Sequence, residues 1–400
     1  MTRLSPEEFL EQADRWLAER YPAVGRSMAR TEDQRALQDS LRGFLTDQLP
    51  PAALRGMLEK DPGYSPELHA RLAREMDLAG LTIPEKFGGL GLSQAEACVV
   101  HTELGRALYP GPFLAGGLAA TALLAAAGPE AAGHEAAGLW LPRLADGSVT
   151  GTIAAADKDG RWSSGPGSVR AHLTSHGWRL YGRCWYVIAA HVAGIIAVPA
   201  VAGSVPATFL VEAGAPGLAV SGQPGLDLTR RVCVTAFDAT PAVLLGQGDA
   251  AGAALARAER EFLLATAAEA VGGIGWCLDT AVVYANDRVR FGRPADSFQA
   301  VARACVDMLE ALQSAEAAAR YAAVADADGA AEAPTAARVA ALLAGQAYRT
   351  VTEAAIRLFG GIGFTSEHDV HLYYRRAWSA ERLSGGPQTH RAALGNLAGP

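Results

Sequence analysis

Several side chains in the last part of the chain are of types that transfer protons or bind metal ions. His390 lies in the segment SGGPQTHR, and because a histidine changes its charge near neutral pH, it could act there as an acid or a base. A local contact at the start of a helix is the alternative interpretation of His390. His368 and His371 are three residues apart beside Glu367, but no matching set of further ligands accompanies them, so we assign no metal. The five cysteines show no CxxC spacing, which favours buried thiols over a zinc site or a disulfide framework.

The hydrophobic pattern changes twice along the chain and predicts three parts that position these residues. Apolar residues recur at three-to-four spacing through residues 5–145, which is typical of helices. From about 149 to 245 the apolar runs are short, rich in Val, Ile and aromatic residues, and separated by Gly, Pro and Ser, as in a small β domain. Beyond Gly252 the helical period returns in three long segments, roughly 253–288, 299–327 and 335–359. We therefore predict a helical domain, a β domain and a second helical domain at residues 1–147, 148–248 and 249–400.

Composition and charge exclude several classes of protein. A content of 50% hydrophobic and 19% charged residues is typical of a soluble globular chain with a large core. A net charge of -7 without a concentrated basic patch argues against nucleic-acid binding. The first residues, MTRLSPEEFLEQADRW, lack the apolar core of a signal peptide, and no 18-residue apolar run free of charges or helix breakers follows them. We expect a cytoplasmic protein that binds neither nucleic acid nor a membrane.

Four segments of the chain, in this order and spacing, carry a family resemblance. They are LAREMDLAGLTIPEKFGGLGLSQAEACVVHTELGRALYPGP (72–112), GLDLTRRVCVTAFDATPAVLLG (225–246), RVRFGRPADSFQAV (288–301) and FGGIGFTSEHDVHLYYRRAWSAERLSGGPQTHR (359–391). Together they resemble the signatures of the acyl-CoA dehydrogenase family, which uses FAD to desaturate acyl thioesters. The resemblance covers nearly the whole chain. It implies the α+β fold of that family, with an N-terminal helical domain, a middle β-barrel-like or sandwich domain and a C-terminal four-helix bundle.

The resemblance also implies which residues bind FAD. A dinucleotide needs guanidinium or amide donors for its pyrophosphate and apolar walls for its ring system. By similarity, Arg288, Phe291 and Gln299 match family positions that contact FAD from a neighbouring subunit. Gly360 and Gly361 match a close approach of the backbone to the cofactor. The alternative interpretation of Arg288 is a cation at a helix end, that of Phe291 is a core aromatic residue, and that of the two glycines is a plain helix C-cap.

Some positions that face the flavin in the family carry other residues in this chain. The tripeptide Ala-Asp-Lys at 156–158 stands where the family commonly has Thr-Glu-Pro, so a hydroxyl is lost. Tyr186 can still form a wall of the ring site, but Ile188 stands where a Thr or Ser hydrogen-bonds the edge of the ring. Arg357 stands where Gln is frequent and brings a positive charge toward the adenosine side. We still expect FAD to bind, with its electronic properties tuned differently.

The largest departure is at Ser384, where the family usually has its catalytic glutamate. Desaturation needs a carboxylate against the α carbon, a role that Ser384 cannot fill. Glu261 is one substitute, because some family members carry the base at a place that matches Phe262. On an ideal helix the side chain of Glu261 would point about 100° away from that of Phe262. A solvated helix face is the alternative interpretation of Glu261. Glu381, one helical turn before Ser384, is a second substitute, with an exposed last turn as its alternative. A partner chain that supplies the base is the third.

Three functions from different classes follow. The favoured one is a FAD-dependent dehydrogenase of an acyl thioester, bound to CoA or to an acyl carrier protein, in biosynthesis or as one subunit of a heteromer. The second is a flavoprotein of the same fold that catalyses hydroxylation or a non-redox conversion. The third is a non-catalytic subunit that completes its partner's FAD site. We expect another flavoprotein or oxygen as the electron acceptor, and a homodimer, homotetramer or heteromer assembled through the C-terminal domain.

Overall fold

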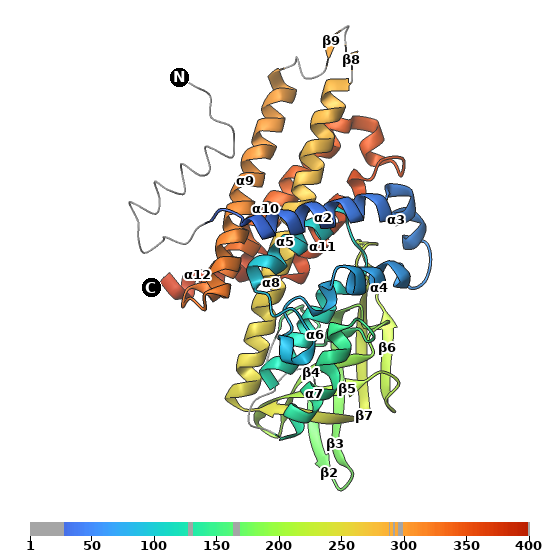
Figure 1. The fold of residues 1–400 in the computed structure, drawn as a ribbon, viewed down its shortest axis with the longest axis vertical. Helices are drawn as coiled ribbons and strands as arrows, with labels where there is room; N and C mark the ends of the chain where they lie inside the picture. Colours follow the sequence, from blue (N-terminus) through green and yellow to red (C-terminus); the bar gives the residue numbers. More distant parts are fainter. Residues whose placement is uncertain are drawn as a thin grey trace.

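The computed structural model describes residues 28–126, 131–162, 169–287, 289–290, 293–294 and 299–398. In chain order these residues form a helical part, a β-sheet part and a second helical part (Figure 1). The predicted α+β architecture, with a mixed sheet between two helical parts, is therefore confirmed. The helical pattern expected over residues 5–27 lies outside the described residues.

The N-terminal part is helical because its segments carry clear start signals. Its elements are α2 (Glu32–Gln48), α3 (Pro51–Leu58), α4 (Pro66–Glu75), η2 (Leu78–Gly80), η3 (Glu85–Phe87), α5 (Gln94–Arg106), α6 (Phe113–Ala126) and α7 (Ala131–Ala145). Thr31 and Ser93 each form a capping box at the starts of α2 and α5. Ser65 caps α4, where Pro66 takes the first helical position. Helix α6 is apolar on nearly every side and accordingly is mostly buried, against β1 and α8.

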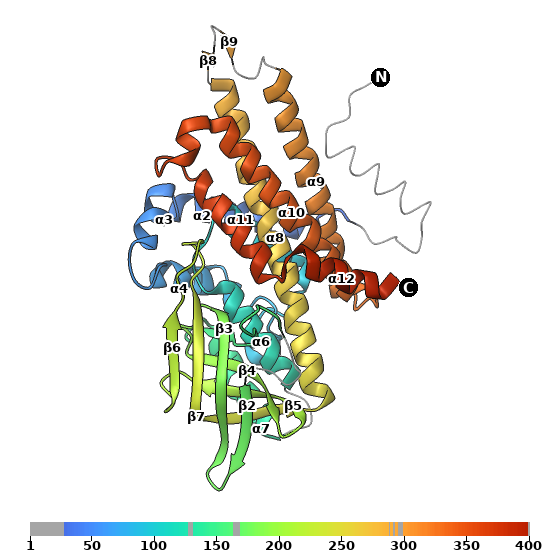
Figure 2. The same ribbon diagram turned by 180° about the vertical axis from the view of Figure 1, so that it is seen from behind.

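The middle part is one sheet of seven strands whose pairing closes a ring. The strands are β1 (Gly151–Ile153), β2 (Val169–Thr174), β3 (Gly177–Ile188), β4 (Ile195–Ala202), β5 (Val205–Glu212), β6 (Leu218–Gly222) and β7 (Val232–Gln247). The ring runs β4, β2, β3, β7, β5 and back to β4, with β1 added beside β4 and β6 beside β7 (Figure 2). Leu180, Val198 and Phe209 are fully buried in its core. The sequence did not predict β2 or β6, because both are largely exposed and carry no continuous apolar run.

The C-terminal part is built on long helices that match the predicted segments within a few residues. Its elements are α8 (Asp249–Asp287), β8 (Val289–Arg290), β9 (Arg293–Pro294), α9 (Gln299–Ala327), α10 (Ala333–Phe359), η5 (Gly360–Phe364), α11 (Val370–Leu383) and α12 (Gly386–Ala398). Helix α8 packs against α5, α6, α9 and α10 and runs the length of the molecule (Figure 1). Among the described helices, α8 alone is long and apolar enough to cross a membrane, but 89% of its most apolar window is buried inside the fold, as in the core helix of a globular protein.

Helices α5 and α8 cross at very short range. A Cβ atom on Gly105 would lie 2.2 Å from the carbonyl oxygen of Glu269, and one on Gly272 would lie 1.8 Å from that of Thr102. Only glycine fits at these two positions. The close crossing brings His101 of α5 beside Glu269 of α8, with 3.6 Å between His101 Nδ1 and Glu269 Oε1.

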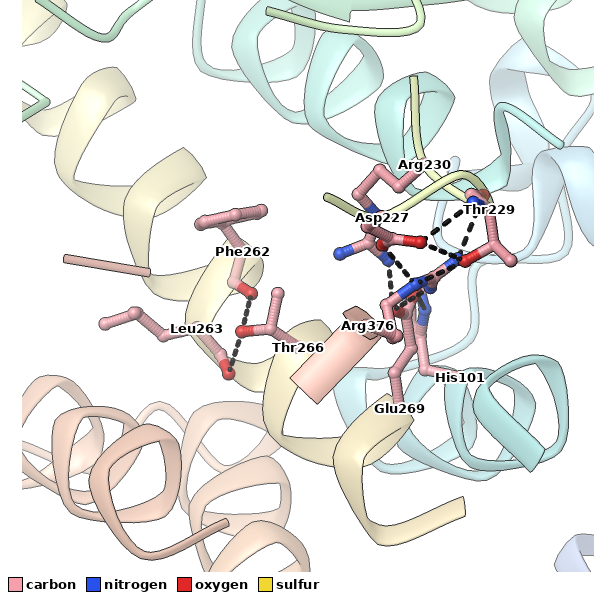
Figure 3. Close-up of polar contacts among 9 residues, drawn as sticks. All are labelled: His101, Asp227, Thr229, Arg230, Phe262, Leu263, Thr266, Glu269 and Arg376. Atoms are coloured by element: carbon pink, nitrogen blue, oxygen red, sulfur yellow. Dashed lines mark hydrogen bonds and ion pairs between the residues drawn. The ribbon is translucent and has the colours of Figure 1, made fainter. Parts of the chain in front are cut away.

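A buried network of charges joins the three parts of the fold (Figure 3). Asp227 and Arg230 come from the loop between β6 and β7, Glu269 from α8 and Arg376 from α11, and each is less than 10% exposed. Arg376 binds Asp227 Oδ2 through Nε at 2.8 Å and Glu269 Oε2 through Nη1 at 3.2 Å, while Arg230 binds the same Glu269 oxygen. Two guanidiniums thus balance two carboxylates, which is the condition for burying charge.

The electrostatics of Glu269 reflect this pairing. Burial alone raises the pKa of Glu269, but Arg230, His101 and Arg376 outweigh burial and hold that pKa well below its ordinary value. Because the pKa is lower in the folded state, the stabilisation is fully present above the unfolded carboxyl pKa of about 4.3. It is lost progressively as the pH falls below that value.

Removing Arg376 is expected to destabilise the protein strongly. Arg376→Ala leaves Asp227 without its arginine and Glu269 with only Arg230, so the unfolding free energy should fall by about 3 to 5 kcal/mol. Urea denaturation followed by circular dichroism measures this loss. Arg375→Ala is the matched control, because Arg375 has no ion pair in the described part of the chain and its loss should change stability by at most about 0.5 kcal/mol. Equal losses in the two variants would show that the network does not hold the fold together.

Candidate functional site

A cavity of about 850 Å³ lies between the sheet and the C-terminal helices. Its walls come from α6, α8, α10, α11, the start of α12, and strands β1 and β3 with the turn that follows β1. The residues that line it include Ala156, Trp162, Trp185, Tyr186, Ile188, Phe262, Arg349, Trp378, Glu381, Arg382, Gln388 and Arg391. One large cavity is therefore shared by the middle and C-terminal parts of the fold.

One wall of the cavity is aromatic. The rings of Trp162 and Phe262 are stacked, with centroids 5.3 Å apart and planes inclined by 16°. Trp185 and Tyr186 continue this wall from β3. Tyr186 has a positive φ of 55°, and its amide donates to Gln223 Oε1 at 3.0 Å, which holds the backbone in this uncommon conformation. The wall can therefore contact a flat ring system.

The opposite wall carries donors for an anionic group. Arg349 binds Glu381 Oε1 at 3.2 Å and lies 4.8 Å from the centre of the Trp378 ring. Arg382 and Arg391 line the cavity without an ion-pair partner among the described residues. Between them the chain turns at Gly385 and Gly386, whose φ angles of 101° and 75° favour glycine, and α12 begins. Guanidiniums beside the positive end of a helix suit a phosphate or carboxylate.

Ser384 forms the C-cap of α11, beside this wall. Its hydroxyl donates to the carbonyl oxygen of Glu381 at 3.1 Å. Its neighbours Leu383 and Gly385 line the cavity, whereas Ser384 is not among the lining residues. The position at which the resemblance implies a base thus lies at the edge of the cavity and holds no carboxylate.

Glu261 and Phe262 point in different directions from α8, as the helical geometry predicts. Phe262 lines the large cavity, whereas Glu261 lines a separate cavity of about 40 Å³ together with His69 and His101. The expectation of a solvated face for Glu261 is wrong: α6 covers it, it is 7% exposed, and the Thr121 hydroxyl donates to it. Burial raises the pKa of Glu261, partly offset by that hydrogen bond.

Glu381 and His390 are both buried. An exposed last turn is wrong for Glu381, which is 6% exposed because α10 packs over it, with Arg349 bound to its carboxylate. His390 lies within α12 and is 2% exposed. Burial, with a smaller contribution from Arg338, lowers the pKa of His390 to about 4, so the ring is neutral at pH 7. His390 does not line the large cavity, although the residues on either side of it do.

The predicted FAD residues fall into two groups in one copy of the chain. Tyr186 lines the large cavity. Gln299 begins α9, Arg357 lies in the last turns of α10, and Gly360 and Gly361 follow in η5. These four residues lie at the end of the helical bundle where β8 and β9 are found (Figure 1). This second group does not line the cavity, and Arg357 is exposed; among the described residues its one ion pair is with Glu353, at 3.8 Å. Arg288 and Phe291 lie outside the described residues.

Sequence reasoning missed most of the polar wall and the buried network. Arg349 stands in a helix without any motif around it, and Trp378 lies in the segment 359–391 without a recognised role, so only their packing on facing helices reveals the pair. Two arginine pairs in the sequence, at 230–231 and 375–376, gave a weak signal: in each pair one member is buried in the charge network. Among the described residues, no group of three or more His, Cys, Asp or Glu side chains is arranged to hold a metal ion.

Comparison with known proteins identifies the family. The chain matches the profile "Acyl-CoA dehydrogenase, N-terminal domain" over residues 31–148 and the profile "Acyl-CoA dehydrogenase, C-terminal domain" over residues 259–396. The protein belongs to the acyl-CoA dehydrogenase family. Acyl-CoA dehydrogenase IpdE2 of Mycobacterium tuberculosis is 34% identical over 361 residues, which cover 90% of this chain and 96% of the relative.

Two solved structures show the same fold over nearly the whole chain. The ChsE4-ChsE5 complex from Mycobacterium tuberculosis is 26% identical with a TM-score of 0.84, covering 94% of this chain and 100% of the matched chain. A variant of the Tcur3481-Tcur3483 steroid ACAD is 29% identical with a TM-score of 0.81, covering 92% and 98%. The cofactor of this acyl-CoA dehydrogenase family member is FAD.

The cavity fits FAD in the kinds of group it presents. Its aromatic wall suits the flavin ring, and Arg382, Arg391 and Gln388 can donate to the diphosphate. The predicted loss of hydroxyl donors is visible in the wall: Ala156 and Ile188 both line it, and the neighbouring Thr152 hydroxyl donates to the carbonyl oxygen of Ile188 at 2.6 Å. A flavin ring bound against this wall would have fewer side-chain donors than one bound where these positions carry a hydroxyl.

Restoring one hydroxyl should tighten FAD binding. Ile188→Thr places a donor on the cavity wall, and one added hydrogen bond of about 0.5 to 1.5 kcal/mol corresponds to an approximately two- to tenfold lower dissociation constant. Quenching of flavin fluorescence on titration measures the constant. Ile188→Val is the matched control, since it keeps the β-branch without a hydroxyl and should not tighten binding. If both variants bind FAD alike, position 188 does not face the ring.

Proposed function

We propose that this protein is one subunit of a heteromeric, FAD-dependent acyl-CoA dehydrogenase that desaturates a bulky, ring-containing acyl thioester. The observation that carries the proposal is the large cavity. Its lining includes the flavin-facing positions Ala156, Tyr186 and Ile188 together with Phe262 and the loop around Ser384, the two places where family members carry the base. A site for the flavin and a site for the reacting carbon are thus adjacent.

The shape and chemistry of the cavity support a ring-containing acyl group. The stacked Trp162 and Phe262 rings offer a broad flat surface beside the apolar side chains of Leu118 and Ile153. Such a surface is complementary to a fused ring system and would exclude water around it. One of the relatives with a similar structure is named as a steroid ACAD, which supports the same class of acyl group.

Two observations support assembly with a second, different chain. Both similar structures described above are named as complexes of two proteins. In this chain, the predicted FAD residues of α9, α10 and η5 are separate from the cavity, as expected if they complete a site in a neighbouring subunit. The outer end of the bundle also exposes apolar side chains suited to an interface: Val283 is 58% exposed and Val306 is 61% exposed.

The roles of the chain's own residues follow from their positions. When bound, FAD supplies the acceptor for the hydrogen and electron pair that leave the β carbon of the acyl group. Tyr186 and Trp185 bind the ring, and Arg382 and Arg391 bind phosphate groups at the other wall. Phe262 and Trp162 orient the acyl group and keep water away from it. A second flavoprotein or oxygen would be the final electron acceptor.

Loss of Arg288 tests the FAD site across the interface. If Arg288 contacts FAD of a neighbouring subunit, Arg288→Ala should weaken FAD retention by about 1.5 to 3 kcal/mol through loss of a charge-assisted contact. The FAD content of the purified assembly, read from its visible spectrum during dilution, measures retention. Arg303→Ala removes an exposed arginine of α9 as a control and should leave FAD bound. Full retention in Arg288→Ala would assign Arg288 to a solvated helix end.

Assembly through the outer ends of α8 and α9 is tested at Val306. Val306→Lys places a charge in the proposed interface and should shift the protein to smaller species in size-exclusion chromatography with light scattering. Leu173→Lys changes another exposed apolar residue, on β2, and should leave the assembly intact. A parent protein that is a stable monomer with FAD bound would contradict the proposed assembly.

A further inference from the structure

Most buried carboxylates in the described part of the chain have donors that hold them firmly. Glu103 accepts from Arg42 and Gln38, Glu269 binds two arginines, and Asp227 binds Arg376. Glu381 is different. Its Oε1 accepts one bond from Arg349 at 3.2 Å, and its Oε2 is buried with neither a hydrogen-bond nor an ion-pair partner in that part of the chain. A buried acceptor left without a partner is uncommon and marks a candidate functional group.

Glu381 is also placed where the reaction needs a base. It lines the large cavity, whereas Glu261 and His390 do not. Asp159 is the other carboxylate among the described lining residues, but it is exposed, in the turn where its amide donates to Asp157 Oδ1 at 2.8 Å. Solvent around Asp159 would hydrate its charge and weaken it as a base toward a bound thioester. Glu381 is therefore the one buried carboxylate on this cavity in the described part of the chain.

The neighbours of Glu381 suit a base that lies one helical turn before Ser384 on α11. Ser384 follows Glu381 by three residues (384 − 381 = 3), about one turn of helix, and its hydroxyl donates to the carbonyl oxygen of Glu381. Arg349 is fixed above the Trp378 ring and orients Oε1. Gly345 leaves room beside the side chain, since a Cβ there would lie 3.8 Å from Glu381 Cγ. The loop position has lost a carboxylate, and the preceding turn presents one.

We propose that Glu381 is the base that removes the α proton of the acyl thioester, an inference that rests on the proposed function of this cavity. The α C–H bond breaks heterolytically. Its proton passes to Oε2 of Glu381, which becomes a neutral carboxylic acid, and its electron pair stays on the α carbon in conjugation with the thioester carbonyl. Arg349 is a positioning residue that binds Oε1; Oε2 is closed to the cavity in this conformation, so the side chain must turn toward the cavity to take the proton. The partner chain then need not supply a base.

Exchange of the α hydrogens for deuterium tests this step without any net oxidation. The FAD-loaded protein in its native assembly is incubated anaerobically with 3-cyclohexylpropanoyl-CoA in D₂O, and deuterium at the α carbon is measured by mass spectrometry. Glu381→Gln keeps the size of the side chain and should slow the exchange by about 10² to 10⁴-fold, the usual contribution of a general base. The dissociation constants for FAD and for the thioester should not change. A defect in the structure of the cavity would change them as well.

Matched variants separate the base from its surroundings. Glu261→Gln alters the other buried, incompletely bonded glutamate outside the cavity and should exchange at the parent rate. Glu381→Gln combined with Ser384→Glu returns a carboxylate to the loop and should recover part of the lost exchange. If Glu381→Gln does not fold, Glu381→Asp, which keeps the charge but shortens the side chain, should still exchange more slowly than the parent.

Exchange at the parent rate in a folded Glu381→Gln protein would overturn this assignment and transfer the role to the partner chain. That result would leave the proposed function intact if the parent still oxidises the thioester. A parent assembly that binds no FAD, or whose flavin no acyl thioester reduces, is the separate failure of the proposed function.

Discussion

The buried pairing of Arg230 and Arg376 with Asp227 and Glu269 is the constraint on which the site depends. Charges removed from water must keep their partners, so the β6–β7 loop, α8 and α11 cannot shift independently. Two of these elements, α8 and α11, also line the large cavity. Phe262 precedes Glu269 on α8 by seven residues (269 − 262 = 7), two helical turns, as Figure 3 shows, and Glu381 follows Arg376 on α11 by five (381 − 376 = 5). The network therefore holds α8 and α11, which carry Phe262 and Glu381, in a fixed position relative to each other.

The chain combines an acyl-CoA dehydrogenase scaffold with an altered set of groups around the reacting centre. The aromatic pair Trp162 and Phe262 occupies the place of one possible base, and the α11–α12 turn presents glycines and Ser384 at the place of the other. Arginines from α10, α11 and α12 give the opposite wall a positive character. The fold is thus retained, while Ala156 and Ile188 place no hydroxyl on the cavity wall and the proposed base, Glu381, lies one helical turn before Ser384.

The sequence predicted the features that are encoded locally. Helical periodicity, the glycines at the end of α10 and the angle between Glu261 and Phe262 depend only on nearby residues, and all three agree with the structure. Burial was predicted wrongly for Glu261 and Glu381, because it depends on what packs over them. Glu261 is covered by α6, with Thr121 lying 140 residues earlier in the chain (261 − 121 = 140). Strands β2 and β6 were missed since their exposed faces carry no apolar run, and the partners in the charge network are brought together only by the tertiary fold.

The central claim is that this cavity brings an acyl thioester against FAD, and anaerobic titration of the FAD-loaded assembly with ring-containing acyl-CoA thioesters tests it most directly. The account predicts loss of the flavin's visible absorbance on addition of thioester, with formation of the α,β-unsaturated product in equal amount. A flavin that keeps its full absorbance with every thioester, in a protein shown to bind both ligands, would contradict it.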